Sequence, residues 1–174
     1  MPRITRPDGT VLERHDALSL VRTLGLSLSS GTPPGSAALA EVLADHHLDD
    51  ARTNAILDEV AATLDGGFAG RDVVALFPDT PNLAGILDLF RRPHRHADAG
   101  SRLILAGAGV FGFVLPDGGQ AEMTVAAGDF VHIPAGTEHW FRLTEHRTLV
   151  AVRLFQENPD WRAEYTGTPV QFPH

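Results

Sequence analysis

Two histidines one residue apart, His94 and His96, are the residues of this sequence best suited to chemistry. On an extended strand, side chains alternate between the two faces, so both imidazoles would lie on one face. The same alternation brings position 100 to that face, and position 100 is a glycine. A carboxylate there would complete the two-histidine, one-carboxylate site of non-haem iron oxygenases. The spacing therefore predicts most of a metal site, with Gly100 where a carboxylate ligand would stand.

A third histidine, His139, follows a turn expected at Pro134-Ala-Gly136 and would begin a new strand. His94, His96 and His139 would then face one interior from two strands. Three neutral imidazoles bind several first-row divalent ions, among them iron, nickel, copper, manganese and zinc. Because the chain contains no cysteine, any metal must be held by histidine, aspartate or glutamate.

The composition of the 174 residues excludes several classes of protein. A formal charge of −8 argues against a nucleic-acid surface, which needs a basic stripe. No stretch approaches the roughly 18 consecutive apolar residues of a membrane-spanning helix. The first residues also lack the apolar core of a signal peptide. With 43% apolar residues and no disulfides, the chain is expected to form a cytoplasmic protein with a substantial core.

The first 90 residues carry mainly helical patterns. Ser36 is a suitable N-cap for one helix, and residues 48–64 repeat apolar side chains at helical spacing. A short helix is expected at 82–90, whereas the apolar run 71–77 fits a strand or a helix equally well. We therefore predict one domain over residues 1–174, composed of a mainly helical N-terminal extension at 1–90, a β-barrel core at 91–157 and a C-terminal tail at 158–174.

After residue 90, short apolar runs alternate with turn signals such as Gly107 and Gly128-Asp129. Evenly spaced short strands of this kind predict a sandwich or a jelly-roll barrel. The mouth of such a barrel is a common place for a small-molecule or metal site. The expected strands are Leu103–Leu105, Gly109–Val114, Glu122–Val125, Phe130–Ile133, His139–Leu143 and Thr148–Phe155.

The order of these motifs resembles a known family. The spacing of the histidines relative to Gly107, Gly128 and Pro134-Ala-Gly136 is similar to the two motifs of the cupins. More narrowly, the run from Gly128 to Phe141 and the later Val152-Arg-Leu-Phe155 resemble the acireductone dioxygenase family. The resemblance covers about residues 36 to 167. It implies an all-β cupin fold, which is a double-stranded β-helix or jelly-roll barrel, with an N-terminal helical segment.

The resemblance also implies an activity and a set of site residues. Members of the family use ferrous iron or nickel to add dioxygen to an enolised dihydroxy-ketone and cleave its carbon–carbon bonds. Arg102 matches an arginine thought to hold an anionic substrate oxygen, and we assign it the catalytic role. The remaining matches are the metal ligands His94, His96 and His139 and the pocket aromatics Phe90, Phe141 and Trp161.

The sequence departs from the family pattern at the metal site. The family's glutamate ligand falls on Gly100, and Pro93 stands where the family commonly has an acidic residue. Three outcomes are open. The centre works with three histidines and an anionic substrate or water, a nearby carboxylate (Asp98 or Glu138) takes the missing place, or the site has lost metal and catalysis.

We therefore predict a metal-dependent, acireductone-dioxygenase-like cupin oxygenase with a three-histidine centre. It would act with dioxygen on a small chelating enediol, hydroxyketone or related acid, with Fe(II) as the expected ion and Ni(II) or another first-row ion as alternatives. No nucleic-acid or membrane partner is expected, and a role in specialised metabolism stays open. The alternatives are a non-catalytic cupin that senses a metal or ligand, and an isomerase or lyase that does not use oxygen. Arg102 could equally be a structural arginine in a salt bridge.

Overall fold

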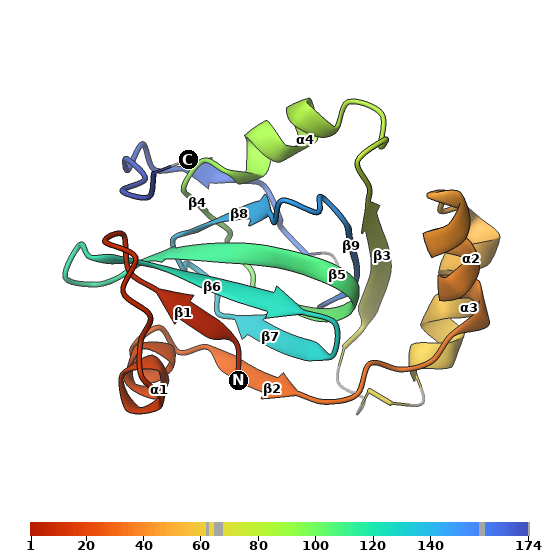
Figure 1. Cartoon of the computed structure of the whole chain (residues 1–174), viewed down its shortest axis with the longest axis horizontal. Coiled ribbons are helices and arrows are strands. Elements are labelled where there is room, and N and C mark those ends of the chain that lie inside the picture. Colours follow the sequence, from red (N-terminus) through yellow and green to blue (C-terminus); the bar gives the residue numbers. More distant parts are fainter. Residues whose placement is uncertain (62, 65–67, 157–158, 174) are drawn as a thin grey trace.

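The computed structural model describes residues 1–61, 63–64, 68–156 and 159–173. In this part of the chain four helices surround ten strands (Figure 1). None of these helices has the length and apolar character needed to cross a bilayer. The helices are α1 (Arg14–Thr23), α2 (Ala37–Asp45), α3 (Asp50–Ala61) and α4 (Leu83–Phe90). The strands are β1 (Arg3–Thr5), β2 (Ser27–Ser30), β3 (Gly70–Leu76), β4 (His94–Arg95), β5 (Gly100–Val114), β6 (Gln120–Ala126), β7 (Asp129–Ile133), β8 (His139–Leu143), β9 (Leu149–Phe155) and β10 (Glu164–Tyr165).

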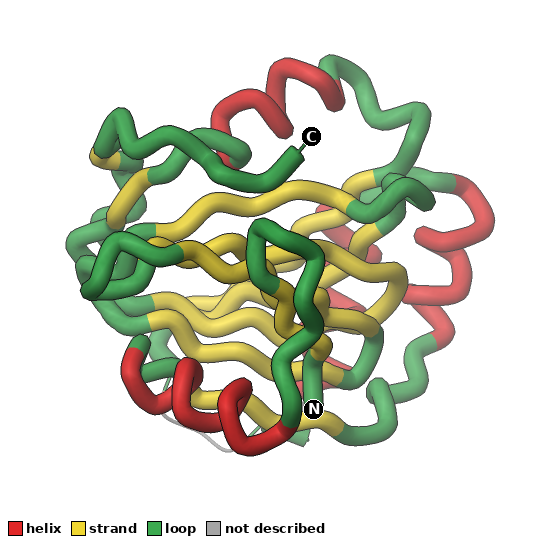
Figure 2. The backbone as a smooth tube through the Cα atoms, turned by 60° about the vertical axis from the view of Figure 1, so that its left-hand side comes forward, coloured by secondary structure: helices red, strands yellow, loops and turns green. Residues whose placement is uncertain are grey.

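Strand β5 joins two antiparallel sheets into a barrel. Its first half pairs with β7 and β9, and its second half pairs with β6 and β8. One sheet therefore has the order β2-β7-β5-β9-β3, and the other has the order β1-β6-β5-β8-β4-β10. Figure 2 shows the strands of both sheets around a common interior, with the helices at the periphery.

Strand β5 passes from one sheet to the other around Gly107. The register of β5 against β9 shifts between Ile104 and Ala106, and Gly107 has a φ of +72°, which glycine adopts at little cost. A Cβ on Gly107 would overlap the carbonyl group of Thr148. The prediction of two strands separated by a turn at Gly107 was therefore wrong. A β-bulge bends one long strand instead, because a bulge adds local twist without ending the pairing.

The first 90 residues contribute more to the barrel than their helical pattern predicted. Strand β1 pairs with β6, β2 with β7, and β3, which falls in the ambiguous run 71–77, with β9. The division at residue 90 is therefore corrected, because the helices lie outside the barrel but the strands between them complete its sheets. Strands β1 and β2 have only three and four residues, too few to show a period of two.

The helices expected in this region do form. The Ser36 hydroxyl accepts a hydrogen bond from the Leu39 amide at 2.9 Å and so caps α2, as predicted. Helix α4 occupies residues 83–90, within the run predicted as helix. Helices α2 and α3 lie side by side next to β3 (Figure 1), and α3 packs against that strand.

Alternation of side chains divides the buried core into two clusters. In β9, Leu149 and Ala151 belong to the cluster inside the barrel, whereas Val150 and Val152 pack with residues of α2 and α3. Both faces of β9 are therefore buried. This double burial explains why its sequence is a nearly continuous apolar run rather than an alternating one.

The end of the chain is held against the barrel. Strand β10 pairs with β4, so that Tyr165 lies opposite His94. Beyond β10, the buried Gln120 amide donates to the Pro169 carbonyl oxygen at 2.7 Å and accepts from the Gln171 amide at 2.8 Å. The segment predicted as a tail is thus part of the sheet next to the histidines. Its expected boundary at residues 157 and 158 lies outside the described residues.

Packing around β8 yields a prediction on stability. Gly112 of β5 pairs with Trp140, and a Cβ on Gly112 would overlap the buried indole. We expect Gly112→Ala to lower the free energy of unfolding by about 1–3 kcal/mol, because overpacking strains a closed core. Gly31→Ala is the matched control, since a Cβ at that position would meet no atom within 4 Å. Urea unfolding measures both, and equal stability of the two variants would contradict this packing.

Candidate metal centre

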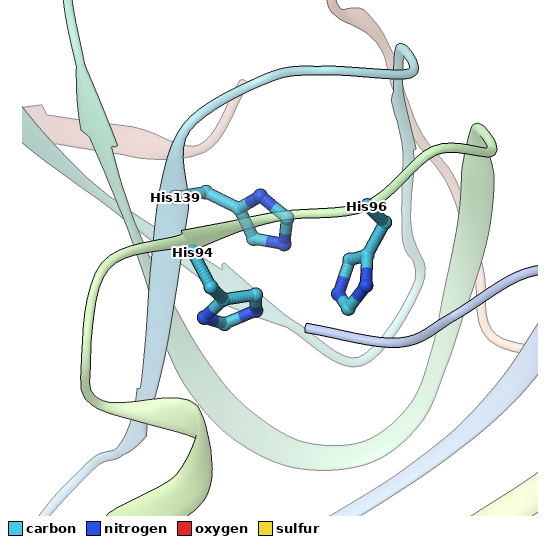
Figure 3. Close-up of side chains that lie close together, drawn as sticks. All are labelled: His94, His96 and His139. Atoms are coloured by element: carbon cyan, nitrogen blue, oxygen red, sulfur yellow. The ribbon is translucent and has the colours of Figure 1, made fainter. Parts of the chain in front are cut away.

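His94, His96 and His139 come together from neighbouring segments. His94 lies in β4, His96 follows that strand, and His139 begins β8. Strands β4 and β8 pair directly at His94 and His139, which brings these two rings side by side. The ring centroids are 4.6 Å apart for this pair, 4.9 Å for His94 and His96, and 5.4 Å for His96 and His139. Figure 3 shows the three rings converging on one space.

Backbone carbonyl groups orient the rings. Nδ1 of His94 lies 2.7 Å from the Arg92 carbonyl oxygen, and Nδ1 of His139 lies 2.8 Å from that of Thr137. Nδ1 of His96 lies 3.3 Å from the Arg162 carbonyl oxygen. A carbonyl oxygen only accepts hydrogen bonds, so each Nδ1 carries the proton. Each Nε2 therefore keeps a lone pair, which is the tautomer that a metal-ligating histidine needs.

The surroundings also keep the rings neutral. Burial is the largest cause that lowers the pKa of His139, from 6.5 to about 3. It likewise lowers the pKa of His94 and His96, and the charge of Arg102 contributes to lowering that of His96. Desolvation disfavours the imidazolium form, and the hydrogen bonds to carbonyl groups compensate only in part. Protons therefore compete little with a metal ion at neutral pH.

This donor set fits a divalent first-row metal ion. The three histidines form the group of potential ligands that the described residues offer, with one ligand atom of each within 4.8 Å of the others. Neutral imidazoles with fixed tautomers suit iron, nickel, zinc and related ions, and Zn–N distances are about 2.0–2.1 Å. Two ligands of one ion at such distances cannot be more than about 4.2 Å apart, so small side-chain movements would close the group around an ion.

The two carboxylates considered as substitute ligands have other partners. Asp98 Oδ2 accepts a hydrogen bond from the Asp160 amide at 2.5 Å, which ties the segment before Trp161 to the loop after His96. Glu138 binds Arg95 at 2.9 Å and the hydroxyl groups of Thr166 and Thr168. Neither belongs to the histidine group. The structure thus gives Asp98 and Glu138 different tasks from the metal contact that the sequence left open.

Arg102 lies next to the glycine that stands in the carboxylate position. A Cβ built on Gly100 would be 2.7 Å from Nη1 of Arg102. This guanidinium donates to the Ser101 carbonyl oxygen at 3.1 Å, and no carboxylate of the described residues pairs with it. The alternative of a structural salt bridge is therefore not supported. Burial first and the neighbouring Arg153 second lower the pKa of Arg102 to about 10, so it remains charged at neutral pH.

A cavity of about 90 Å³ opens beside the histidines. Phe90 and Phe141 line it, together with Arg102 and Arg153. Trp161 instead lines a smaller cavity of about 10 Å³ that includes Asp98 and Gly100 and also touches His96, His139 and Arg102. The remaining residues around the cavity of about 90 Å³, apart from the histidines, are apolar: Val74, Leu76, Ile104, Phe111, Leu149 and Ala151.

Two features of the site were missed in the sequence. The first is the pairing of Arg153 with Asp72 across β9 and β3, where two nitrogens of the guanidinium bind both carboxylate oxygens. The second is Tyr165, whose ring lies edge-on to His94 and whose hydroxyl donates to the Leu89 carbonyl oxygen at 3.0 Å. A charged residue inside the apolar run of β9 was the available signal for Arg153. Nothing local indicated Tyr165.

The barrel and its histidine group define a metal-dependent, dioxygenase-like cupin. Comparison with protein families supports this class, because the model of the ARD/ARD′ family matches residues 36–163. The chain belongs to the ARD/ARD′ family. This finding confirms the recognition, the enzyme class and the all-β cupin fold that the sequence motifs predicted.

Individual relatives agree with this assignment. An acireductone dioxygenase of Trichodesmium erythraeum is 34% identical over 171 residues, which are 95% of this chain and 94% of the relative. One of Microcystis aeruginosa is 45% identical over 109 residues, or 63% of this chain and 60% of the relative. A solved acireductone dioxygenase from Bacillus anthracis, with a cadmium ion in its active centre, shares the fold with a TM-score of 0.76, 23% identity and coverage of 95% and 98% of the two chains.

The buried histidines predict how the stability of the metal-free protein depends on pH. Between pH 6.5 and about 3 the unfolded chain binds a proton at position 139 that the folded chain does not bind. The free energy of unfolding should therefore fall as the pH falls below 6.5, by up to about 1.4 kcal/mol per pH unit for this group. Denaturant unfolding between pH 7 and pH 5 should show a shallower slope for His139→Gln. The exposed His146→Ala variant should keep the wild-type slope, and identical slopes in all three would refute the assignment.

Proposed function

We propose that this chain is a metal-dependent dioxygenase that acts on a small chelating enediol, hydroxyketone or related acid through His94, His96 and His139. One observation carries the proposal: three neutral imidazoles, with their Nδ1 atoms bound to carbonyl groups, converge beside a small apolar cavity with a cationic end. Family membership supports dioxygen as the co-reactant. The cytoplasmic location expected from the composition stays a prediction.

Fe(II) is the ion that we propose, with Ni(II) as the alternative. Both accept imidazole nitrogen, and the implied family chemistry uses either ion. A bound ion of this kind supplies Lewis acidity and a common meeting place for substrate and dioxygen. The carbonyl groups of Arg92 and Thr137 hold His94 and His139 in the ligating orientation, so little reorganisation is needed on binding.

The other residues of the cavity bind and orient the substrate. Arg102 stabilises an anionic oxygen of the substrate through charge-assisted hydrogen bonds. Phe90 and Phe141 cover the apolar part of the substrate and exclude water, which strengthens the electrostatic interactions beside them. Among the described residues that line this cavity there is no carboxylate that could act as a general base, and Asp98 lines the adjoining smaller cavity instead. The substrate is therefore expected to enter as an anion or to lose its proton under the influence of the positive charges.

Gly100 is the reason why we propose a reaction other than the ordinary one of the family. The resemblance assigns a glutamate ligand to this position, and without it the three histidines that would bind the ion carry no negative charge. We therefore propose a three-histidine centre that acts on a substrate of its own, which would be compatible with specialised metabolism.

Metal content and oxygen uptake test the centre. Protein purified without a tag should contain about one equivalent of metal, and His96→Ala should lose most of it because two imidazoles bind weakly. Wild-type protein should consume dioxygen with candidate enediols or hydroxyketones, and His96→Ala should not. His146→Ala, with an exposed side chain, should retain both properties. Equal metal content in wild type and His96→Ala would refute the centre, and turnover without oxygen uptake would favour an isomerase or lyase.

Restoring a carboxylate at position 100 tests its place in the site. We expect Gly100→Glu to raise the affinity for Fe(II) roughly tenfold or more and to shift the products toward those of acireductone cleavage, because an anionic ligand adds attraction that imidazole lacks. Gly100→Ala adds the Cβ but no charge, and only the flexible end of Arg102 must yield to it. Competition with a chromogenic chelator measures both affinities. No difference between the two variants would place position 100 outside the ligand shell.

A further inference from the structure

Arg102 brings a positive charge to the site and forms no ion pair with a carboxylate of the described residues, although the charge of Asp72 acts on it from a distance. The neighbouring Arg153 is neutralised by Asp72, which it binds through two nitrogens. Arg102 has five N–H donors, and within the described part of the chain one of them donates, to the Ser101 carbonyl oxygen. Its guanidinium also lies 5.3 Å from the centre of the Trp161 ring. The remaining donors are thus available to a ligand.

A metal ion at the histidines would add to this charge. Three neutral imidazoles contribute no negative charge, so a divalent ion beside Arg102 creates a strongly positive region between packed strands. Burying an isolated charge among packed strands costs free energy unless an opposite charge is buried with it. The histidine group contains no carboxylate. Asp98 lines the cavity at Gly100, but its Oδ2 atom is bound to the Asp160 amide and it lies outside the histidine group. The further negative charge is therefore expected to come with the ligand.

The space for such an anion lies at Gly100. This residue has no side chain, and a small cavity there is lined by His96, Asp98, His139 and Arg102 as well. The Oδ2 atom of Asp98 accepts a hydrogen bond from the Asp160 amide. His96, His139 and Arg102 also line the larger cavity of about 90 Å³. An anionic group that contacts Arg102 is therefore next to two of the three imidazoles, while the rest of its molecule can extend along the apolar wall.

We propose that Gly100 and Arg102 form a carboxylate subsite, and that the ligand of this centre is a short α-hydroxy or α-keto acid with an apolar tail. This inference rests on the proposed metal centre and specifies its substrate class. The ligand carboxylate supplies the negative charge that the three histidines lack, and the adjacent oxygen allows chelation of the ion. The planar fork of a guanidinium matches a carboxylate through two parallel hydrogen bonds.

The size and polarity of the cavity favour this class over larger anions. About 90 Å³ is less than the 150 Å³ of an engineered cavity that binds benzene, so the part of the ligand that enters this cavity has only a few non-hydrogen atoms. Apart from the histidines and arginines, its wall is apolar. A short aliphatic tail fits that wall, whereas a sugar or a nucleotide would leave its hydroxyl groups without partners.

Lactate and its neutral analogue lactamide are suitable probes. Full-length protein is freed of metal and titrated with Co(II), whose visible spectrum reports the bound ion, with and without each probe. When two ligands favour each other, each raises the affinity of the protein for the other by the same factor, which is commonly about 5- to 150-fold. We expect lactate to raise the apparent affinity for Co(II) within this range, after correction for free Co(II)–lactate complexes. Lactamide should change it less than twofold.

Arg102 variants separate a carboxylate contact from a structural role. Arg102→Met should remove the effect of lactate and should bind Co(II) more tightly than wild type when no anion is present, because a like charge is gone. Arg102→Lys keeps the charge but not the fork, and it should retain part of the coupling. If Arg102 had only a structural role, both variants would bind Co(II) more weakly than the wild type. The ratio of the Co(II) affinities with and without lactate would then be the same in the variants and the wild type.

The outcomes distinguish this inference from the metal centre itself. Two results would overturn the carboxylate subsite and leave the metal centre intact. In the first, the wild type binds Co(II) tightly, but lactate and lactamide change its affinity equally. In the second, lactate changes the Co(II) affinity of Arg102→Met as much as that of the wild type. Failure of the wild type to bind Co(II) contradicts the proposed function. Calorimetry with lactate on the metal-free protein then decides the subsite: binding that Arg102→Met abolishes supports it, and no binding overturns it.

Discussion

The change of partners along β5 is the constraint on which the rest of this structure depends. Because the strand bends at Gly107, one continuous segment takes part in both sheets and closes them around an interior. The half before the bend carries Gly100 and Arg102, and the half after it pairs Phe113 with His139. The cationic residue and one histidine of the candidate metal centre are thus fixed relative to each other through a single strand, so the geometry of the site is as rigid as the barrel.

Local sequence was enough to predict the histidine group but not its surroundings. The period of two in His94-Arg95-His96 and the turn before His139 are properties of short segments, and both led to the correct grouping of side chains. The bond from Asp98 to the Asp160 amide joins residues 62 positions apart, and no local pattern specifies such a contact. The same is true of strands β1 and β2, whose three or four residues gain their structure only by pairing with β6 and β7.

Glycine was the hardest residue to interpret from sequence alone. Gly107 looked like a turn and is a bend within a strand, because its positive φ serves either purpose. Gly100 looked like a missing ligand, and its surroundings give that absence a physical consequence. The guanidinium of Arg102 lies within contact distance of the place that a side chain would take. Compared with the pattern that the resemblance implies, the site lacks a fixed negative charge and keeps the positive charge of Arg102, which favours anionic ligands.

This loss of negative charge links the identity of the metal to that of the substrate. Imidazoles alone rank divalent ions in the Irving–Williams order, so three histidines favour copper and zinc over ferrous iron by affinity. Carboxylate and other anionic oxygen ligands suit harder ions better than nitrogen does. A carboxylate that arrives with the substrate and is held by Arg102 changes the donor set to mixed nitrogen and oxygen at the moment of binding. In such a centre the ligand contributes to the selection of the ion as well as to its charge balance, and the two affinities have to be determined together.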